Sequence, residues 1–474
     1  ASLICAPGPD RSAHRGAMVQ REIEWRSPLA AFAPLAQRDG AALLHGGDAA
    51  EAAQWSFIAA EPARRIECRN GVTIVDGEPV ERSPFDALRA LHAERRRADD
   101  GGSAAAPLRT GLIGFAGYEC GRFVEPSAAG PASPYRIPDF SFGAYDAIAA
   151  FDRRKRYAFV SGRTKAAAER LETLLGGDAE KEQVLAHSFA FRGSNFSRDD
   201  YRAAVAEVVE RIRSGELFQA NISQRICAAA HTTIDPYALF RLASATSSAA
   251  FGAFLQHGAS QILSLSPERF FVVTRNGDAR LAIVAEPIKG TRPRGATRED
   301  DERLLNELIA DPKDRAENIM IADLTRNDLS RICEDHSVRE EAICEAATHA
   351  TVHHLVSRIS GVLRRELNAA DALAAMFPCG SITGAPKAQA MKVIAEIERS
   401  GRGPYCGAIG YIDDRGGADL SVAIRLAIVE GERMAIPVGG GVTLRSDPQA
   451  EHDETLAKAR QFLRLVGIED LVQA

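Results

Sequence analysis

An α+β fold, with antiparallel sheets covered by helices, is predicted by the order of strand and helix signals in this chain. First, residues 269–288 contain two apolar stretches joined at Asn276-Gly277, a dipeptide typical of a tight β-hairpin. Second, residues 406–442 form three further apolar stretches separated by turn residues. Third, amphipathic helical segments lie between and after these hairpins. This order favours antiparallel sheets over the strict strand–helix alternation of a dinucleotide-binding fold.

The N-terminal part of the chain carries two strand signals and one loop signal. Residues 110–118 are predicted to form a strand, and residues 143–161 a hairpin that turns at 152–155. The stretch 93–108 mixes charged residues with Gly, Ala and Pro, which is typical of an exposed loop.

The main boundary is predicted close to residues 192–195, directly before a helix. Ser197 has the position of an N-cap, and Asp200 follows three residues later. Apolar residues then recur at helical spacing on one face, namely Tyr201, Val205, Val208, Val209 and Ile212. We therefore expect an N-terminal region over 1–192 and a larger C-terminal domain over 196–474.

Five helices are predicted in the C-terminal part, at 300–310, 313–330, 368–376, 385–399 and 449–466. The last of them starts at Asp447-Pro448, a capping residue followed by proline at the first helical position. The three strands within 406–442 are expected to turn at 413–416 and at 430–432.

Length and charge restrict the classes of function. The chain has 474 residues, of which 58 are basic and 64 acidic, giving a net charge of −6. At about 150 residues per domain, this length allows roughly three domains, or one large and one smaller domain. The near-neutral balance, without a long basic tract, argues against a nucleic-acid partner. With 45% apolar and 26% charged residues, the composition is that of an ordinary globular protein.

Cysteine usage and hydropathy indicate the compartment. The 8 cysteines are spread over the chain without a C-x-x-C pair, so neither a disulfide framework nor a structural zinc site is expected. No run reaches the roughly 18 apolar residues of a spanning helix, and the first residues hold too short an apolar patch for a signal peptide. We expect no membrane partner and a location in the reducing cytoplasm.

Lys289 is the first candidate for chemistry, in the segment 287–291 at the end of a predicted strand. About nine in ten lysines are solvated surface groups. This one follows an apolar strand and precedes a Gly-Thr turn, which favours burial. A lysine amine is a nucleophile only in its neutral form, which burial and a neighbouring cation both favour.

Three glutamates are candidate ligands for a divalent cation. Glu451 and Glu454 lie three residues apart on the last predicted helix and share one face, and Glu317 lies on an earlier helix. Carboxylate oxygens are ligands that Mg²⁺ prefers. Glu454 and Lys458, four residues apart, equally suit an exposed ion pair, so the spacing leaves both interpretations open.

Three further features could hold an anionic substrate. The turn Gly439–Gly441 allows backbone N–H groups to approach a carboxylate closely, because no Cβ intervenes. The segment 380–387 opens a helix, whose free N–H groups favour an anion. Arg425, within the apolar run 422–429, would need a carboxylate partner if buried. Together with the acids, these features indicate a metal-assisted site for a small dianion.

Residues 196–474 resemble the chorismate-utilising enzymes, the family of anthranilate synthase component I. The N-terminal part matches more loosely, through 111–119. The resemblance implies a sandwich of antiparallel sheets covered by helices. The matching blocks occur in the family's order, at 218–223, 266–270, 287–291, 323–328, 352–357, 380–387 and 439–454.

Two positions separate the activities within this family. Members that add water to C2 of chorismate carry a lysine, the base that activates water, where this chain has Gln219. Members that make anthranilate typically carry alanine where this chain has Lys289. A lysine there resembles the aminodeoxychorismate synthases (component I), in which its amine attacks C2 and ammonia then adds at C4. The resemblance therefore implies formation of 4-amino-4-deoxychorismate for p-aminobenzoate and folate biosynthesis.

The resemblance also implies a role for each matched residue. Lys289 would be the nucleophile, Glu268 the general acid that protonates the departing hydroxyl, and His354 a catalytic residue near the ring. Mg²⁺, held by Glu317, Glu451 and Glu454, would bind the ring carboxylate. The substrate-binding residues would be Gly290, Thr291, Thr383, Tyr405, Arg425, Gly439, Gly440 and Gly441.

Production of ammonia from glutamine requires a cysteine nucleophile on a tight turn, and no Gly-x-Cys-x-Gly segment occurs among the cysteines. We therefore expect a separate glutamine amidotransferase subunit (component II) that supplies ammonia to a heterodimer. Two alternatives stay open: an anthranilate synthase component I that tolerates Lys289, and a relative that binds chorismate without converting it.

Overall fold

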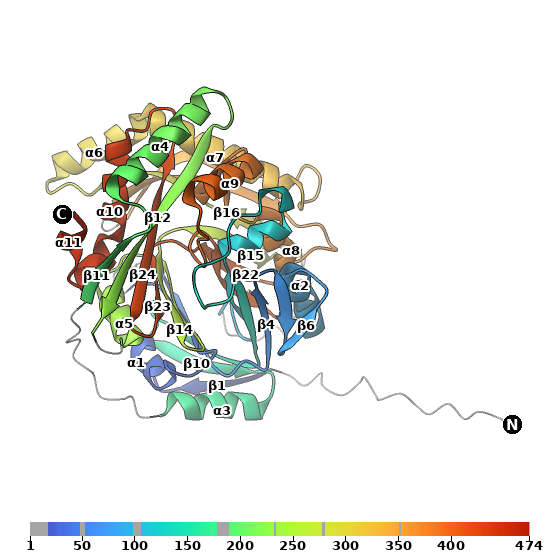
Figure 1. Cartoon of the computed structure of the whole chain (residues 1–474). Coiled ribbons are helices and arrows are strands. Elements are labelled where there is room, and N and C mark those ends of the chain that lie inside the picture. The colour runs from blue at the N-terminus through green and yellow to red at the C-terminus, as the bar shows by residue number, and fades with distance from the viewer. Residues whose placement is uncertain are drawn as a thin grey trace.

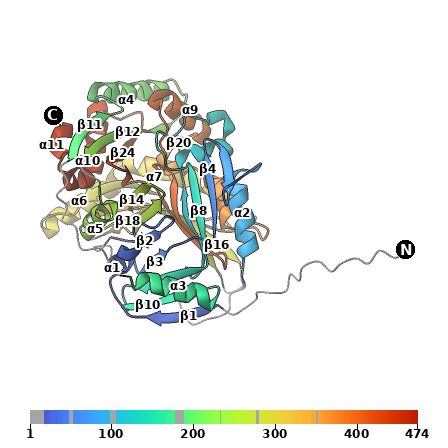
Figure 2. The same cartoon turned by 60° about the horizontal axis from the view of Figure 1, so that its bottom comes forward.

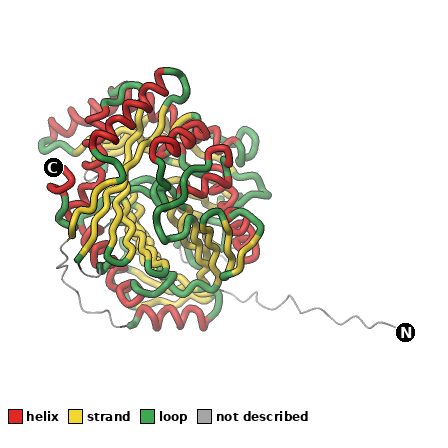
Figure 3. The backbone as a smooth tube through the Cα atoms, in the orientation of Figure 1, coloured by secondary structure: helices red, strands yellow, loops and turns green. Residues whose placement is uncertain are grey.

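The computed structural model describes residues 18–47, 53–97, 106–177, 189–231, 234–276, 280–349 and 352–473. Its framework is a pair of 12-stranded antiparallel sheets with helices around them (Figure 1). Strands lie mostly in the interior and helices mostly at the periphery (Figure 3). The predicted α+β class, a sandwich of antiparallel sheets covered by helices, is confirmed.

The first sheet combines strands from both ends of the chain. In spatial order its strands are β1 (Val19–Ile23), β10 (Tyr157–Gly162), β9 (Ala147–Asp152), β3 (Trp55–Ala59), β2 (Ala42–His45), β13 (Phe251–His257), β14 (Ser260–Ser266), β23 (Leu426–Glu430), β24 (Arg433–Val442), β12 (Gln219–Ala230) and β11 (Phe189–Ser194), with β20 (Gly384–Ala385) beside β12.

The second sheet also combines strands from the N-terminal and C-terminal parts of the chain. Its order is β17 (Ile288–Pro293), β19 (Val352–Val362), β16 (Leu281–Ala285), β15 (Arg269–Arg275), β22 (Ala418–Val422), β21 (Ala408–Asp413), β7 (Gly111–Ala116), β8 (Phe140–Tyr145), β4 (Arg64–Arg69), β5 (Val72–Val75) and β6 (Glu78–Val80), with β18 (Arg339–Thr348) beside β19.

The helices cover the outer faces, and α3 packs against β9 and β10 at one end of the molecule (Figure 2). In chain order they are α1 (Pro28–Phe32), α2 (Pro84–Arg95), α3 (Lys165–Leu175), α4 (Arg198–Arg213), α5 (Pro236–Ala245), α6 (Arg298–Ala310), α7 (Pro312–Ser330), α8 (Ala369–Met376), α9 (Lys387–Glu398), α10 (Pro448–Leu465) and α11 (Glu469–Gln473). Among these described helices, none is both long and apolar enough to cross a membrane.

The two sheets pack face to face through a shared apolar core. Phe57 of β3 in the first sheet contacts Tyr411 of β21 in the second, with ring centroids 5.6 Å apart. The N-terminal strands join the C-terminal strands in both sheets, through β2–β13 in the first and β7–β21 in the second. The division at 192–196 stays a prediction about the sequence, because in space both parts contribute to the same sheets.

Most predicted elements have counterparts in the structure. The five C-terminal helices correspond to α6–α10, and Ser197 and Asp447 cap α4 and α10 by accepting hydrogen bonds from backbone N–H groups. The hairpin over 269–288 is β15–β16, although Gly277 lies outside the described residues. The predicted strand at 110–118 is β7, and the hairpin at 143–161 is β9–β10.

Two predictions need correction. The run 406–442 forms four strands, not three, because the chain leaves the second sheet after β22 and enters the first at β23. Arg425 lies at this crossing with a left-handed φ of 52°, a conformation that interrupts a strand. The loop predicted at 93–108 starts too early, since α2 continues to Arg95, whose buried guanidinium binds Asp414. Residues 98–105 lie outside the described part of the chain.

A buried ion pair fixes the end of α9 against β12. Arg402 and Glu398 approach to 2.6 Å with side chains only 2% and 3% exposed. Arg402 also donates to the carbonyl oxygen of Asn221 at 2.6 Å. Removing one partner of a buried pair leaves the other charge uncompensated.

We expect Arg402→Ala to lower the free energy of unfolding by roughly 3–5 kcal/mol, because Glu398 would stay buried without its partner. The matched control is Arg213→Ala on α4, where the arginine is 59% exposed and its ion pair with Glu210 lies at the surface. Surface pairs contribute about 0–1 kcal/mol. Urea denaturation checks both variants, and equal stabilities would contradict this role of the buried pair.

Candidate active site

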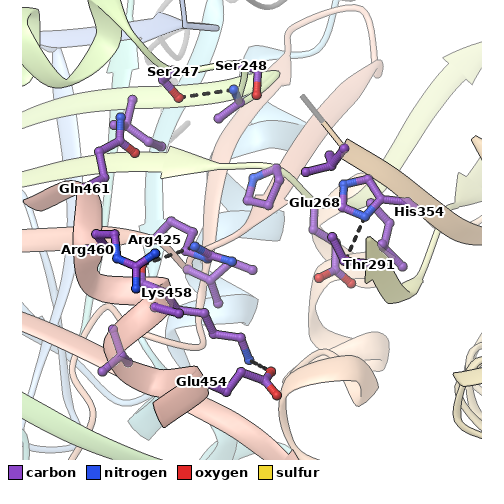
Figure 4. A pocket seen from close by; sticks show the side chains of 18 of the residues that line it. Ser247, Ser248, Glu268, Thr291, His354, Arg425, Glu454, Lys458, Arg460 and Gln461 are labelled. Atoms are coloured by element: carbon purple, nitrogen blue, oxygen red, sulfur yellow. Dashed lines mark hydrogen bonds and ion pairs between the residues drawn. The ribbon is translucent and has the colours of Figure 1, made fainter. Parts of the chain in front are cut away.

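A cavity of about 1770 Å³ lies where β17, β24, α7 and α10 meet (Figure 4). Most of the predicted site residues line it, although they come from distant parts of the sequence. These are Glu268, Lys289, Gly290, Thr291, Glu317, His354, Tyr405, Arg425, Gly439, Gly441, Glu451 and Glu454.

Two predicted residues do not line the cavity. Thr383 is completely buried, and its hydroxyl donates to the carbonyl oxygen of Cys379 at 2.9 Å. Successive residues of β24 face opposite sides of the sheet, so Gly440 does not line the cavity as Gly439 and Gly441 do. A Cβ at Gly440 would lie 2.9 Å from the Oε2 atom of Glu451. Their roles in substrate binding stay predictions.

Lys289 projects from β17 towards a turn on the opposite side of the cavity. Its Nζ atom donates to the carbonyl oxygen of Ser381 at 3.0 Å. A Cβ at Gly441 would lie 3.4 Å from Nζ and 2.8 Å from the Nε2 atom of Gln219. The missing side chain at Gly441 therefore leaves room beside the Lys289 amine.

Glu268 lies between β14 and β15 and is 6% exposed. Burial raises the pKa of Glu268, an effect that hydrogen bonds from Ser381 and Ile288 and the charge of Lys289 only partly offset. Its Oε1 atom is buried without a hydrogen-bond partner. Glu268 is therefore a carboxyl that keeps its proton at higher pH than usual and has one oxygen unengaged, which suits a general acid.

His354 lies on β19 and lines the cavity beside Thr291 (Figure 4). Its Nδ1 atom is 3.0 Å from the hydroxyl oxygen of Thr291. Burial, and to a lesser degree His349, lowers the pKa of His354 to about 4, so the ring is neutral near pH 7. The neighbouring His353 points elsewhere, since its Nε2 atom lies 2.9 Å from Asp301 Oδ1 of α6.

The three glutamates all line the cavity, and Glu317 and Glu451 share a cationic neighbour, Lys313, whereas Glu454 pairs with Lys458. The Lys313 ammonium lies 4.0 Å from Glu317 Oε1 and 3.8 Å from Glu451 Oε1. Burial raises the pKa of both these carboxyls. Burial also disfavours ionisation of Glu454, but its ion pair with Lys458 at 2.6 Å outweighs this and lowers its pKa. The ion pair between Glu454 and Lys458 that their spacing suggested is therefore present.

These carboxylates fit a hard divalent cation by their chemistry. Glu317 Oε1 is buried without a hydrogen-bond partner, as expected of an oxygen that awaits a ligand. However, within the described ranges no group of three or more His, Cys, Asp or Glu side chains is close enough to hold a metal ion. The Lys313 ammonium instead lies between Glu317 and Glu451.

Arg425 differs from its predicted setting. It was expected inside a buried strand with a carboxylate partner, but it lies between β22 and β23 and faces the cavity (Figure 4). Its Nη1 atom donates to the carbonyl oxygen of Lys458 at 3.1 Å. The guanidinium is therefore available to an anion in the cavity. Tyr405, 4% exposed, lines the same wall.

Sequence reasoning missed Asp314 and gave Lys458 no role beyond an ion pair with Glu454, although both line the cavity. Lys458 donates to the carbonyl oxygen of Gly439 at 2.9 Å and brings a second cation beside Arg425. Asp314, three residues before Glu317, adds a further carboxylate to the cavity wall, and its helical spacing could have identified it. Gln219 is completely buried, and neither its amide nitrogen nor its amide oxygen has a hydrogen-bond partner.

Comparison with known proteins decides the family. The sequence model of a family described as chorismate binding enzyme matches residues 41–464. The chain belongs to this family. It is thus an enzyme that acts on chorismate, and the cavity that collects its matched residues is the candidate active site of this chorismate-binding enzyme.

Relatives with two different named activities match this chain at similar identity. Aminodeoxychorismate synthase component 1 of Klebsiella aerogenes is 35% identical over 447 residues, covering 93% of this chain and 97% of the relative. Anthranilate synthase component 1 of Thermus thermophilus is 32% identical over 453 residues, covering 93% and 95%. The structure of anthranilate synthase component I from Streptococcus pneumoniae superimposes with a TM-score of 0.75 at 31% identity, over 86% of this chain and 92% of that one. Similar identities to both groups leave the choice of reaction to individual residues of the site.

Proposed function

We propose that this chorismate-binding enzyme is an aminodeoxychorismate synthase component I, which converts chorismate and ammonia to 4-amino-4-deoxychorismate and water. The observation that carries the proposal is Lys289, which lines the same cavity as the buried acid Glu268. A nucleophile and a proton donor in one cavity suit the displacement of a poor leaving group.

In the first displacement, the neutral Lys289 amine forms a bond to C2 of the ring while the C4–O bond breaks and the ring double bond shifts. Glu268 transfers its proton to the departing oxygen, which leaves as water. In the second displacement, ammonia bonds to C4, the double bond shifts back and the C2–N bond to Lys289 breaks. The ammonium nitrogen at C4 then returns one proton to Glu268, which restores both residues.

Substrate binding rests on local charges, because a protein with a net charge of −6 does not attract a dianion globally. Arg425, Lys458 and Tyr405 line one wall of the cavity and would take the enolpyruvyl carboxylate with backbone N–H groups of Gly439–Gly441. Gly290 and Thr291 would line the ring. Mg²⁺, when held by Glu317, Glu451 and Glu454, supplies positive charge for the ring carboxylate.

The choice of ammonia over water is supported by Gln219. Its carboxamide lies next to Gly441 and cannot act as the base that activates water. Ammonia would come from a separate glutamine amidotransferase subunit in a heterodimer, with free ammonium salts as a substitute. We also place the enzyme in the cytoplasm, where p-aminobenzoate would enter folate biosynthesis.

Anthranilate synthase is the second candidate, favoured by the similar identity of relatives with that name. That reaction places nitrogen at C2 and eliminates pyruvate. The Lys289 amine, at the position where such members typically carry alanine, argues against direct access of ammonia to C2.

The proposal is tested by incubating the protein with chorismate, Mg²⁺ and an ammonium salt. We expect a product that 4-amino-4-deoxychorismate lyase converts to p-aminobenzoate. Anthranilate fluorescence without the lyase would replace this proposal by the second candidate. Chorismate binding without turnover would indicate a non-catalytic relative.

Lys313 offers a separate test of the metal site. Because its ammonium occupies the space between Glu317 and Glu451, Lys313→Met should tighten Mg²⁺ binding, by about tenfold or more if one nearby charge is removed at 4 Å. Isothermal titration calorimetry without substrate measures this affinity directly. The control is Lys165→Met, whose side chain is 72% exposed on α3. Weaker binding in Lys313→Met than in the control would argue against a cation between these glutamates.

A further inference from the structure

Two carboxamide side chains lie on one face of β12 near the Lys289 amine. Gln219 and Asn221 are two residues apart on this strand, so their side chains point to the same side of the sheet. Gln219 is completely buried, and Asn221 is 6% exposed. Asn221 lines the active-site cavity, and Gln219 lies against Gly441, which lines the cavity as well.

These two carboxamides are not satisfied within the protein. The Oε1 and Nε2 atoms of Gln219 and the Oδ1 atom of Asn221 are buried and have no hydrogen-bond partner in the described part of the chain. A buried polar atom nearly always has such a partner, because it otherwise loses its hydration without compensation. Three unpaired atoms on one strand face at the active site therefore indicate a ligand with hydrogen-bonding groups.

Glycines on the neighbouring strand β24 let these amides and the Lys289 amine converge. Asn221 pairs with Gly441 in the register of the two strands. A Cβ at Gly441 would lie 2.8 Å from Gln219 Nε2 and 3.4 Å from Lys289 Nζ. A Cβ at Gly439 would lie 2.9 Å from Asn221 Oδ1. Both amides therefore lie at the part of the cavity wall that the Lys289 amine approaches.

We propose that Gln219 and Asn221 bind the ammonia substrate beside Lys289, with their carboxamide oxygens accepting its N–H groups. This inference deepens the proposed function and rests on it. Ammonia has three N–H groups and one lone pair, and the lone pair must stay free to form the bond to C4. Hydrogen-bond acceptors that carry no charge suit this ligand, because they hold the N–H groups without favouring ammonium over reactive ammonia.

The Gln219 amide can present its oxygen to this ligand. Nε2 is the atom next to Gly441, but neither end of the amide is held by a hydrogen bond. A half-turn about the last side-chain bond therefore exchanges Oε1 and Nε2.

The place of the ammonia site follows from the order of the two displacements. Lys289 bonds to C2 of the ring, and the ammonia lone pair then forms the C4–N bond while the C2–N bond to Lys289 breaks. C2 and C4 are separated by one ring atom, so the two nitrogens must approach the ring from neighbouring positions. Gln219 and Lys289 both reach the position of Gly441, as this requires.

The experiment compares wild type, Gln219→Met and Asn221→Ala by the initial rate of chorismate consumption, at fixed pH and increasing ammonium chloride. We expect KM for ammonium to rise roughly three- to tenfold in each variant, as for loss of one hydrogen bond between neutral groups. KM for chorismate should be nearly unchanged. Gln389→Met on α9, whose amide donates to Glu216 at 2.7 Å, is the matched control and should behave like wild type.

Thermal unfolding separates ligand binding from a structural role. Because the Gln219 amide has no partner among the described residues, Gln219→Met should unfold at the same temperature as wild type or at a higher one. A lower unfolding temperature with unchanged KM for ammonium would overturn the inference. If Asn221→Ala does not fold, Gln219→Met alone decides.

Unchanged KM for ammonium in the folded variants would also overturn the inference. An equal rise in KM for chorismate would assign the amides to chorismate binding and overturn it too. Chorismate consumption is followed whatever the product, so failure of the proposed function is seen separately. No turnover by wild type, or nitrogen at C2 of the product, would contradict the proposed function, whereas turnover with unchanged KM for ammonium would contradict only the ammonia site.

Discussion

Replacing Lys289 with alanine should reduce formation of 4-amino-4-deoxychorismate by at least about a thousandfold, because the covalent route loses its nucleophile. The carboxylate-binding groups Arg425 and Lys458 are unaffected, so chorismate affinity should change little. Any residual turnover should place nitrogen at C2, since the substitution opens the space beside Gly441 that Lys289 Nζ now occupies.

The measurement is the product formed per enzyme in single-turnover reactions, with chorismate affinity from fluorescence titration. Lys165→Ala, which changes an exposed lysine on α3, serves as the matched control and should behave like wild type. Full activity of Lys289→Ala would remove the covalent step from the mechanism.

Replacing Glu268 with glutamine should lower kcat by about 10²–10⁴-fold, the usual contribution of a general acid. The carboxamide has the shape of the carboxyl and can still accept hydrogen bonds, but it cannot transfer a proton to the departing oxygen. The effect therefore isolates proton donation from packing. Glu302→Gln on α6, at a side chain 61% exposed, is the control and should leave kcat unchanged.

The pH profile gives an independent check on Glu268. Because burial raises its pKa, the protonated, donating form persists to higher pH than for an ordinary carboxyl. Activity should fall as pH rises through this raised pKa, and the fall should be absent from the residual activity of Glu268→Gln. An identical alkaline limb in the variant would assign that limb to another group.

Local signals in the sequence were sufficient to predict most helices and strands of the C-terminal part. Ser197 and Asp447 cap α4 and α10, and the periodicity of apolar residues predicted α6–α10. These features depend on neighbours within a few residues. The break at Arg425 was not foreseen, because a left-handed residue other than glycine carries no local signal and the strands it separates belong to different sheets.

The site likewise contains residues that local sequence patterns identify and contacts that depend on the tertiary fold. Matched blocks include Lys289, Glu268, Glu451 and Glu454, which line one cavity together with Glu317. The hydrogen bond from Lys289 to the carbonyl oxygen of Ser381 depends on the meeting of β17 and the 380–382 turn, which are far apart in sequence. Likewise, Lys313 lies four residues before Glu317 on α7, but its approach to Glu451 of α10 depends on the tertiary fold and follows from no spacing in the chain.

The position of the new nitrogen on the ring tests the proposed reaction most directly. Chorismate, Mg²⁺ and ¹⁵N-ammonium are incubated with the enzyme, and ¹H–¹⁵N long-range correlation NMR identifies the carbon that carries the label. The presence of Lys289 and Glu268 in one cavity predicts ¹⁵N at C4 of a ring that retains its enolpyruvyl group. Label at C2 of an aromatic ring, with free pyruvate, would contradict it.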